Sequence, residues 1–160
     1  MPLALRPFSR MMFTMVRWAA RRGLADTPQG ESGSAKQQAR RTGVRGETFA
    51  YWYLRRQGYV FVARNYTARG MKGEIDLVGY DGPVLAFVEV KTRTAGEETA
   101  ARPEDAVTPE KRRHLARIAR QFLYEWRVRE AAWRFDVVAI ESRPGRAPEV
   151  RLHKGAFGET

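Results

Sequence analysis

The 160-residue chain contains no cysteine and only two histidines, His114 and His153. Without cysteine, neither a disulfide nor a thiolate metal site can form, and this composition suits the reducing cytoplasm, where we expect the protein to reside. The two histidines lie far apart and lack HExxH spacing, so we do not expect a zinc site. No apolar run approaches the roughly 20 residues that a membrane-spanning helix needs.

The chain is strongly basic, with 29 Lys and Arg against 18 Asp and Glu, a net charge of +11. Such a balance favours a polyanionic partner, either nucleic acid or an anionic membrane. The excess is uneven, because residues 1–46 hold nine Lys or Arg and two Asp or Glu, a net charge of +7. That leaves +4 for residues 47–160, so nucleic-acid contact by this second segment must use locally placed basic side chains.

Residues 1–24 combine arginine with apolar residues at the spacing of an amphipathic helix. The apolar core is short and interrupted by Arg17, which does not match a secretory signal, whereas an organelle transit peptide fits the composition better. The other interpretations are a helix that contacts a membrane surface or a partner, a disordered extension, and a start at Met11, Met12 or Met15. Residues 25–42, rich in Gly, Ser, Gln and Pro, predict a linker. We therefore expect a flexible extension over residues 1–42 and a folded domain over residues 43–155.

The rest of the sequence alternates helical and strand patterns. Apolar positions at offsets of three, four and seven predict a helix over residues 43–57 that ends at Gly58. Thr108-Pro109 supplies an N-cap and a first-turn proline for a second helix, which we expect to reach about Arg129. The apolar run in residues 84–92 is typical of a central strand covered on both faces. Predicted strands span residues 59–63, 74–80, 84–92, 134–141 and 149–152, which indicates an α/β domain with a mixed central sheet flanked by helices.

Three charged residues, Asp76, Glu89 and Lys91, stand out in two neighbouring predicted strands. The turn signal Asp81-Gly82-Pro83 separates these strands and favours a hairpin. Side chains alternate along a strand, so Glu89 and Lys91 share a face, and a closed hairpin brings Asp76 to them. Two carboxylates and an ammonium in one place suit a divalent metal held near a phosphate. The alternative is a solvated strand face, because short motifs of this kind often match by chance.

The metal that fits this set is Mg²⁺ (or Mn²⁺), which prefers oxygen ligands and retains several waters. We predict Asp76, Glu89 and the carbonyl of Val90 as its protein ligands. Lys91 should keep its proton beside two carboxylates. Its expected role is therefore to position the nucleophile and to stabilise charge on the phosphate, and general-base catalysis by this lysine is disfavoured.

Further charged residues lie on the two predicted helices. Glu47 precedes the apolar stripe of the first helix by one turn, where it is either a solvated helix-end group or a member of a shared polar pocket, and Lys111 has the equivalent place on the second helix. Asp136, inside an apolar strand, is either a buried structural hydrogen-bonding group or part of a site. We expect the core stripe of the second helix to include Trp126. Its other face is basic and is either a solvated surface or a phosphate-binding one, and the candidate nucleic-acid contacts are Arg93, Lys111, Arg112, Arg113 and Arg117.

The arrangement of Asp76 followed by Glu89-Val90-Lys91 resembles the PD-(D/E)xK nuclease superfamily, the restriction-endonuclease-like fold. A wider set of motifs narrows the resemblance: Gly46-Glu47, Arg64-Asn65-Tyr66, Gly73-Glu74-Ile75-Asp76-Leu77-Val78, Phe87-Val88-Glu89-Val90-Lys91-Thr92-Arg93, Ala106-Val107 before Lys111, and Arg134-Phe135-Asp136-Val137-Val138. Together these motifs look like the uncharacterised bacterial YraN-type family, which is similar to archaeal Holliday-junction resolvases. The resemblance covers about residues 43–141, and Ile75 stands where the superfamily motif has proline.

This resemblance implies a metal-dependent endonuclease acting on DNA, including branched or otherwise structured DNA. It maps Asp76 and Glu89 to the metal-binding carboxylates, Lys91 to the catalytic lysine, and Glu47 to the helix-borne acid of resolvase-like members. A resolvase needs two active sites, so the analogy also implies a symmetric homodimer. Two alternatives stay open: a nucleic-acid-binding protein that keeps the fold without cutting, and a protein docked to a membrane or partner through its N-terminal segment.

Overall fold

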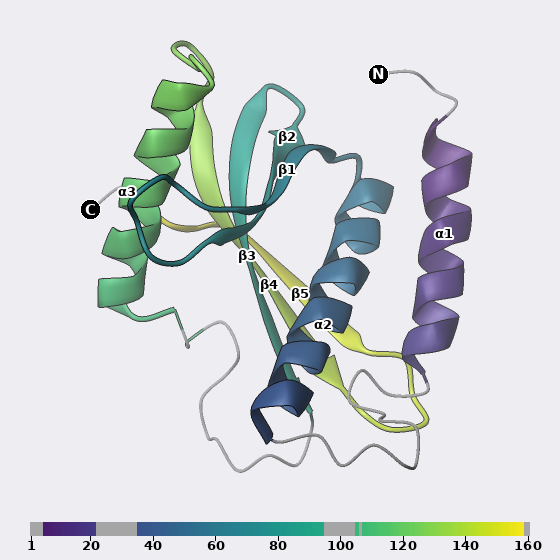
Figure 1. The fold of residues 1–160 in the computed structure, drawn as a ribbon. Helices are drawn as coiled ribbons and strands as arrows, with labels where there is room; N and C mark the ends of the chain where they lie inside the picture. The colour runs from purple at the N-terminus through teal and green to yellow at the C-terminus, as the bar shows by residue number, and fades with distance from the viewer. Residues whose placement is uncertain (1–4, 22–34, 95–104, 106, 159–160) are drawn as a thin grey trace.

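A computed structural model describes residues 5–21, 35–94, 105 and 107–158 (Figure 1). Within these residues, five strands form one mixed sheet in the order β1-β2-β3-β4-β5. Neighbouring strands are antiparallel except β3 and β4, which are parallel and are connected through α3. The elements are α1 (Leu5–Ala20), α2 (Ala35–Gln57), β1 (Val60–Tyr66), β2 (Ile75–Asp81), β3 (Val84–Thr94), α3 (Pro109–Glu125), β4 (Trp133–Ser142) and β5 (Glu149–Phe157). The predicted α/β domain with a mixed sheet flanked by helices is confirmed.

The sheet separates two hydrophobic cores. α3 covers one face, and α2 covers the other with α1 packed on its outer side (Figure 1). β3 lies at the centre, and its residues from Leu85 to Glu89 are buried, as its apolar run predicts. Successive residues of β3 face alternate cores, with Phe87 against α3 and Val88 against α2. Glu89 therefore faces α3.

The N-terminal part of the chain differs from the expected extension. The first helix of the domain begins at Ala35, eight residues before the predicted start, so the expected boundary at residues 42 and 43 falls inside α2. Residues 35–42 contain no proline that would break the helix. The remaining part of the predicted linker, residues 25–34, lies outside the described residues. α1 packs on α2 through Phe13, whose ring lies 5.5 Å from the ring of Phe49.

The second helix ends earlier than its pattern predicts. α3 stops at Glu125 because Arg127 adopts a left-handed conformation with φ 52°. The N–H of Val128 then donates to the carbonyl of Leu123 at 2.9 Å, a helix-ending arrangement usually built on glycine. Trp126, expected in the core, is 50% exposed, so that prediction was wrong. Its ring stacks on Phe122 at 4.7 Å and covers the end of the helix from outside.

Asp136 is part of a buried polar network on the α2 side of the sheet. Its carboxylate accepts hydrogen bonds from the Tyr59 hydroxyl at 2.8 Å, from Arg134 Nε at 2.8 Å and from the Gly155 N–H at 2.9 Å. A fully buried carboxylate needs such partners, since an uncompensated charge in the interior is costly. Of the two interpretations, the structure therefore supports the structural one. Among the helices described, none has the length and apolar character needed to cross a bilayer.

Candidate active site

The predicted triad lies where β2 and β3 separate. The hairpin pairs Asp81 with Val84 next to its turn and continues to Leu77 opposite Val88. Asp76 is the next residue on β2, and its Oδ2 accepts a 2.6 Å hydrogen bond from the backbone N–H of Val90. A side chain therefore replaces the backbone acceptor at this point of the sheet, which fixes the Asp76 carboxylate against β3. The structure thus places Asp76 next to the Glu89-Val90-Lys91 segment, as the hairpin predicted.

Glu89 is the buried centre of the cluster, with 5% of its side chain exposed. Its Oε1 contacts Nζ of Lys91 at 2.9 Å and also contacts Nζ of Lys111 on α3. The Lys111 backbone is held in place because its N–H donates to Oγ1 of Thr108, the N-cap of α3, at 3.2 Å. Glu89 thus connects the central strand to the first turn of α3 through two ammonium groups.

The electrostatics of the cluster follow from this geometry. Burial, followed by the negative charge of Glu89, raises the pKa of Asp76 to about 7, although the hydrogen bond from Val90 opposes the rise. Burial acts to lower the pKa of Lys111, but the hydrogen bond to Glu89, the charge of Glu89 and smaller contributions from Lys91 and Asp76 together raise that pKa. A carboxyl with a pKa shifted this far is typical of functional sites, where like charges are held together. The pair of Asp76 and Glu89 is an arrangement that a cation would stabilise.

Glu47 approaches the cluster from α2 without joining it. Its Oε2 accepts a 3.0 Å hydrogen bond from Nδ2 of Asn65 on β1, and its charge is close enough to contribute to the raised pKa of Asp76. Asn65 has a positive φ of 48°, which asparagine tolerates better than most residues. Sequence reasoning did not identify Asn65 as a site residue. The only sequence feature that pointed to Asn65 was its place in the Arg64-Asn65-Tyr66 motif.

A glycine brings α2 close to β3 beside the site. A Cβ atom added to Gly46 would lie 2.0 Å from Oγ1 and 3.0 Å from Cβ of Thr92, well inside van der Waals contact. Only glycine permits this approach. Gly46 precedes Glu47 and Thr92 follows Lys91 in the sequence, so the close approach sets the position of the helix-borne acid relative to the strand-borne lysine.

Asp76 and Glu89 are the carboxylate donors that the cluster offers to a divalent cation. No group of three or more Asp, Glu or His side chains is arranged for metal binding in the part of the chain that the structure describes. Mg²⁺ commonly uses only one or two protein carboxylates and retains waters. Asp76 and Glu89 supply two carboxylates, and their contacts to Val90 and to the lysines use Oδ2 and Oε1. The residues therefore fit Mg²⁺ better than a cation whose coordination shell consists entirely of protein ligands.

The predicted nucleic-acid contacts fall into different environments. Lys111 belongs to the Glu89 cluster, and Arg93 pairs with Glu141 at 2.9 Å across β3 and β4. Arg112 donates to the carbonyl of Val107 at 2.9 Å and lies over the ring of Phe157. Arg113 and Arg117 are exposed on α3. Only these last two have the solvent-facing position that the prediction for the basic helix face requires.

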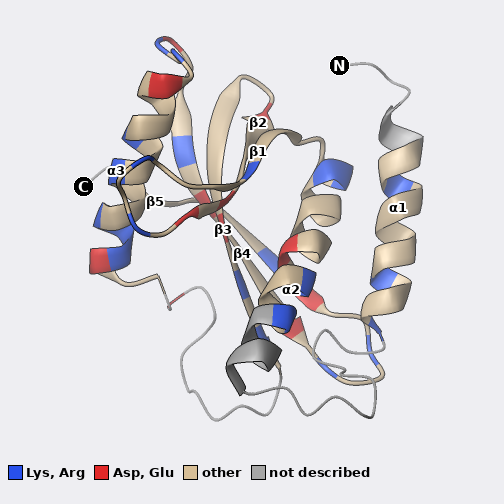
Figure 2. Ribbon diagram, in the orientation of Figure 1, with Lys and Arg blue, Asp and Glu red and all other residues tan. Residues whose placement is uncertain are grey.

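His114 connects α3 to the β1–β2 loop, a contact that sequence reasoning missed. Its Nε2 contacts the carbonyl of Lys72, and its Nδ1 lies 3.2 Å from a guanidinium nitrogen of Arg117. Gly73 has a positive φ of 88°, and an added Cβ would lie 3.0 Å from Nε2 of His114. The loop that leads into Asp76 is therefore held against the basic face of α3. Basic residues lie both on α3 and on the β1–β2 loop beside it (Figure 2).

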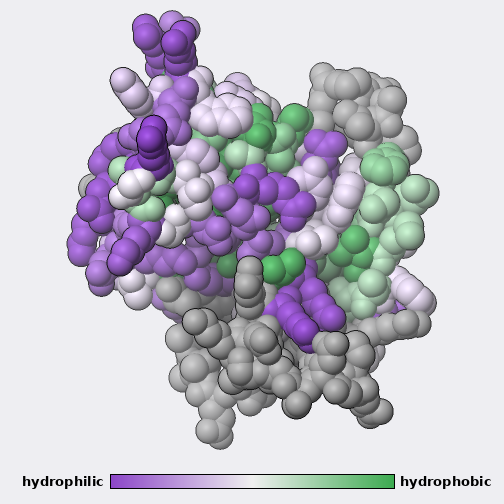
Figure 3. Space-filling view, in the orientation of Figure 1, coloured by the Kyte–Doolittle hydropathy of each residue, from purple (hydrophilic) through white to green (hydrophobic). Residues whose placement is uncertain are grey.

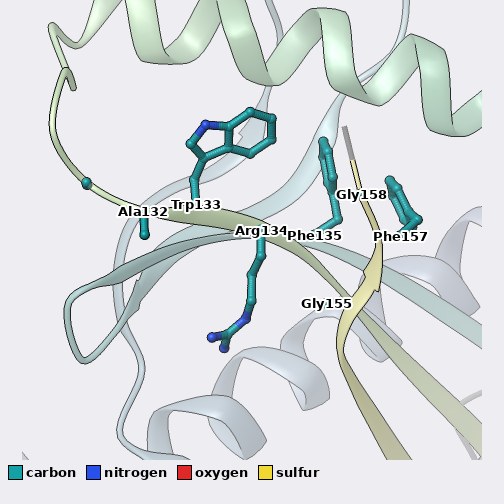
Figure 4. Close-up of a pocket in the computed structure, with 8 residues that line it drawn as sticks. Ala132, Trp133, Arg134, Phe135, Gly155, Phe157 and Gly158 are labelled. Carbon is teal, nitrogen blue, oxygen red and sulfur yellow. The ribbon is translucent and has the colours of Figure 1, made fainter. Parts of the chain in front are cut away.

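A separate hollow of about 540 Å³ lies at the start of β4 and the end of β5 (Figure 4). Trp133, Phe135 and Phe157 project to one side of the sheet there, and Arg134 projects to the other side, toward Asp136 (Figure 4). None of the described residues that line the hollow is a carboxylate or a histidine. The hollow therefore lacks the groups for acid–base or metal chemistry.

Comparisons with known proteins identify relatives over the domain that carries this site. A family model described as "Uncharacterised protein family UPF0102" matches residues 46–140. A UPF0102 protein of Koribacter versatilis is 42% identical over 118 residues, covering 73% of this chain and 79% of the relative. A UPF0102 protein of Symbiobacterium thermophilum is 43% identical over 119 residues, covering 74% of this chain and 98% of the relative. The matched span includes Glu47, Asp76, Glu89, Lys91 and Lys111.

Proposed function

The chain belongs to the uncharacterised family UPF0102, the YraN family, and we propose that it is a metal-dependent endonuclease that hydrolyses DNA phosphodiester bonds. One observation supports this function above the others. Asp76 and the buried Glu89 lie together where β2 and β3 separate, and Nζ of Lys91 contacts Oε1 of Glu89. Holding two carboxylates together costs free energy, since like charges repel. A bound cation would offset this repulsion, whereas a surface without a ligand has no reason to hold the two carboxylates together.

Asp76, Glu89 and the carbonyl of Val90 would hold the metal, which we take to be Mg²⁺ or Mn²⁺. When bound, such an ion lowers the pKa of a coordinated water and neutralises charge on a phosphate. Lys91 positions the nucleophilic water and stabilises the negative charge that develops on the phosphate oxygens. Lys111 shares Oε1 of Glu89 with Lys91, so it holds the Glu89 carboxylate in orientation from the helix side. Glu47, fixed by Asn65, is the third acid at the edge of the site.

DNA is the proposed substrate because of the basic surface around the site. Arg113 and Arg117 face solvent on the same helix as Lys111, and the β1–β2 loop beside them carries Arg69 and Lys72, both exposed. Contacts to phosphates release counterions, so binding through these residues should weaken steeply with salt. Branched or otherwise structured DNA is the substrate class that we would test first, with a homodimer as the form that cuts two strands.

The decisive experiment is cleavage of linear duplex, single-stranded, flap and four-way-junction DNA by the purified chain in Mg²⁺, Mn²⁺ or EDTA. We expect cleavage in either metal and none in EDTA, and we expect Lys91→Met to lower it by about 100-fold. Lys154→Met is the matched control, because Lys154 makes a 2.7 Å ion pair with Asp81 at the other end of the hairpin. Cleavage that persists equally in Lys91→Met would refute the proposed site.

A non-catalytic nucleic-acid-binding protein is the second candidate, and one observation favours it. Two ammonium groups on Glu89 balance the two carboxylates of the cluster, so the charges can be compensated without a metal. This function predicts DNA binding that survives Asp76→Ala and Glu89→Ala, with no cleavage in either metal. Isothermal titration calorimetry with Mg²⁺ distinguishes the two candidates. A nuclease should bind Mg²⁺ with a heat that Asp76→Ala removes, whereas a binding protein that needs no metal should give the same heat in wild type and Asp76→Ala.

A further inference from the structure

We propose that α1 docks this protein onto the surface of an anionic lipid bilayer. The docking surface is an apolar stripe on α1 formed by Phe8, Met11, Met15 and Trp18. Their exposed fractions are 49%, 55%, 58% and 59%, values that large apolar side chains seldom show together on one helix. The spacing of three, four and three residues places all four on one side of the helix. This proposal is independent of the nuclease activity.

Most of the apolar stripe lies outside the surface that holds α1 on the domain. Within the stripe, Phe8 also contacts α2, with its ring 6.1 Å from the ring of Trp52. The inner side of α1 is formed by Phe13 and Ala20, each 5% exposed. Phe13 contacts the rings of Phe49 at 5.5 Å and Tyr53 at 5.8 Å, and the guanidinium of Arg56 lies over it. α1 is thus already packed by one apolar side and still presents a second to solvent. In the space-filling view, hydrophobic surface covers much of the outer side of α1 (Figure 3).

The charge pattern identifies the occupant as anionic. Arg10, Arg17 and Arg21 are exposed and follow one another at about two-turn and one-turn intervals beside the apolar stripe, and α1 contains no Asp or Glu (Figure 2). Helices that lie in a membrane interface combine an apolar side with basic residues that meet the lipid headgroups. Each basic residue near an anionic leaflet adds to binding. α1 is too short and too charged to cross the bilayer, so it would lie in its surface.

Other occupants explain less of this pattern. A second copy of the chain would bring two arginine-bearing helices together, and the like charges would repel. DNA would satisfy the arginines, but phosphate contacts do not require a stripe of exposed apolar side chains. An anionic bilayer is the partner that uses both the apolar stripe and the arginines beside it.

Cosedimentation of the full chain with vesicles tests the proposal. We expect binding to vesicles of phosphatidylcholine with phosphatidylglycerol, weaker binding at high salt, and little binding to phosphatidylcholine alone. Met15→Glu should weaken binding about tenfold or more, the scale expected for losing one buried apolar side chain. Met15→Leu should bind like the wild type. Met71→Glu makes the same change at an exposed methionine of the β1–β2 loop and should leave lipid binding unchanged.

Each contrary result overturns the proposal in a different way. Equal binding of Met15→Glu and wild type would show that the apolar stripe does not contact the bilayer. Equal binding to both vesicle types would show that the protein does not recognise anionic lipid. If no vesicle binds but a concentration-dependent dimer is lost in Met15→Glu, the stripe is an interface between two copies. Thermal unfolding of each variant verifies that α1 still folds on the domain, as expected for exposed positions.

Discussion

Lys111 on α3 and Lys91 on β3 contact the same oxygen, Oε1 of Glu89. The two lysines lie 20 positions apart in sequence, and their meeting depends on the first turn of α3 lying beside Glu89 of β3. This relationship moves Lys111 from the basic surface of α3 into the acidic cluster. It separates the basic residues of α3 into Lys111, which pairs within the cluster, and Arg113 and Arg117, which face solvent.

The first prediction concerns this separation. Lys111→Met and Lys91→Met should each lower single-turnover cleavage by about 100-fold, because each leaves the Glu89 carboxylate less firmly oriented or the phosphate charge less stabilised. Arg113→Met should leave the cleavage rate at saturating DNA unchanged, but weaken binding and reduce its salt dependence. Rapid-quench cleavage and filter binding across a salt series measure the two effects. A Lys111 variant that changes only affinity would place this lysine with the DNA-contacting residues instead.

The second prediction concerns pH. The pKa of Asp76 is raised to about 7 by burial and by Glu89, whereas an aspartate in an unfolded chain titrates near 4. Between these values the folded protein keeps a proton that the unfolded chain has lost, so this group makes stability fall as pH rises through that window. Asp76→Asn removes the charge and keeps an oxygen that can accept from Val90. In EDTA we expect the variant to be about 1 to 3 kcal/mol more stable than wild type at pH 8.

Urea unfolding at pH 8 and near pH 4 measures this difference, which should largely disappear at the lower pH. Added Mg²⁺ should stabilise the wild type at pH 8 and leave Asp76→Asn unaffected, since a ligand stabilises only the state that binds it. An equal stability gain at both pH values would show that Asp76 does not carry the raised pKa.

The third prediction concerns the close approach of α2 to β3. Gly46→Ala should destabilise the domain by about 1 to 3 kcal/mol, because its Cβ would overlap Thr92 and push the helix outward. Gly43→Ala is the matched control one turn earlier in the same helix, where an added Cβ has no atom within 4 Å. That change should instead stabilise α2 by about 0.5 to 1 kcal/mol, since alanine favours helix over glycine. Chemical denaturation of both variants compares them, and equal effects would refute the steric explanation.

The fourth prediction concerns Asn65 as a positioning residue for Glu47. Asn65→Gly keeps the positive φ without strain and removes only the side-chain hydrogen bond, so it should lower the cleavage rate about three- to tenfold with little loss of stability. Asn65→Ala should lose about 1 kcal/mol more in stability, because alanine is strained at φ 48°. A double variant with Glu47→Gln should be no slower than Glu47→Gln alone. Additive losses would mean that Asn65 acts independently of Glu47.

Much of the architecture was predictable from local pattern. The apolar run of β3, the Asp81-Gly82-Pro83 turn and the Thr108-Pro109 cap each determine a local conformation, and the structure contains all three. The meeting of Asp76 with Glu89 and Lys91 was also predictable, since a hairpin and strand alternation suffice to bring them together. The Schellman-type end of α3 was not predictable, because arginine stands where glycine usually marks such an end.

By itself, the sequence determined the family, the strand and helix types, and the meeting of Asp76 with Glu89 and Lys91 on one hairpin. The elements and the hairpin depend on local pattern and on pairing between strands that follow one another in the chain. Only the tertiary structure decided the rest of the cluster. Lys111 joins it from α3, and Glu47 approaches it from α2 with its carboxylate held by Asn65 of β1. The raised pKa of Asp76 arises from burial and from the charge of Glu89. The division of α1 into a packed side and an exposed apolar stripe likewise appears only when α2 is in place, because burial is a property of the packed molecule.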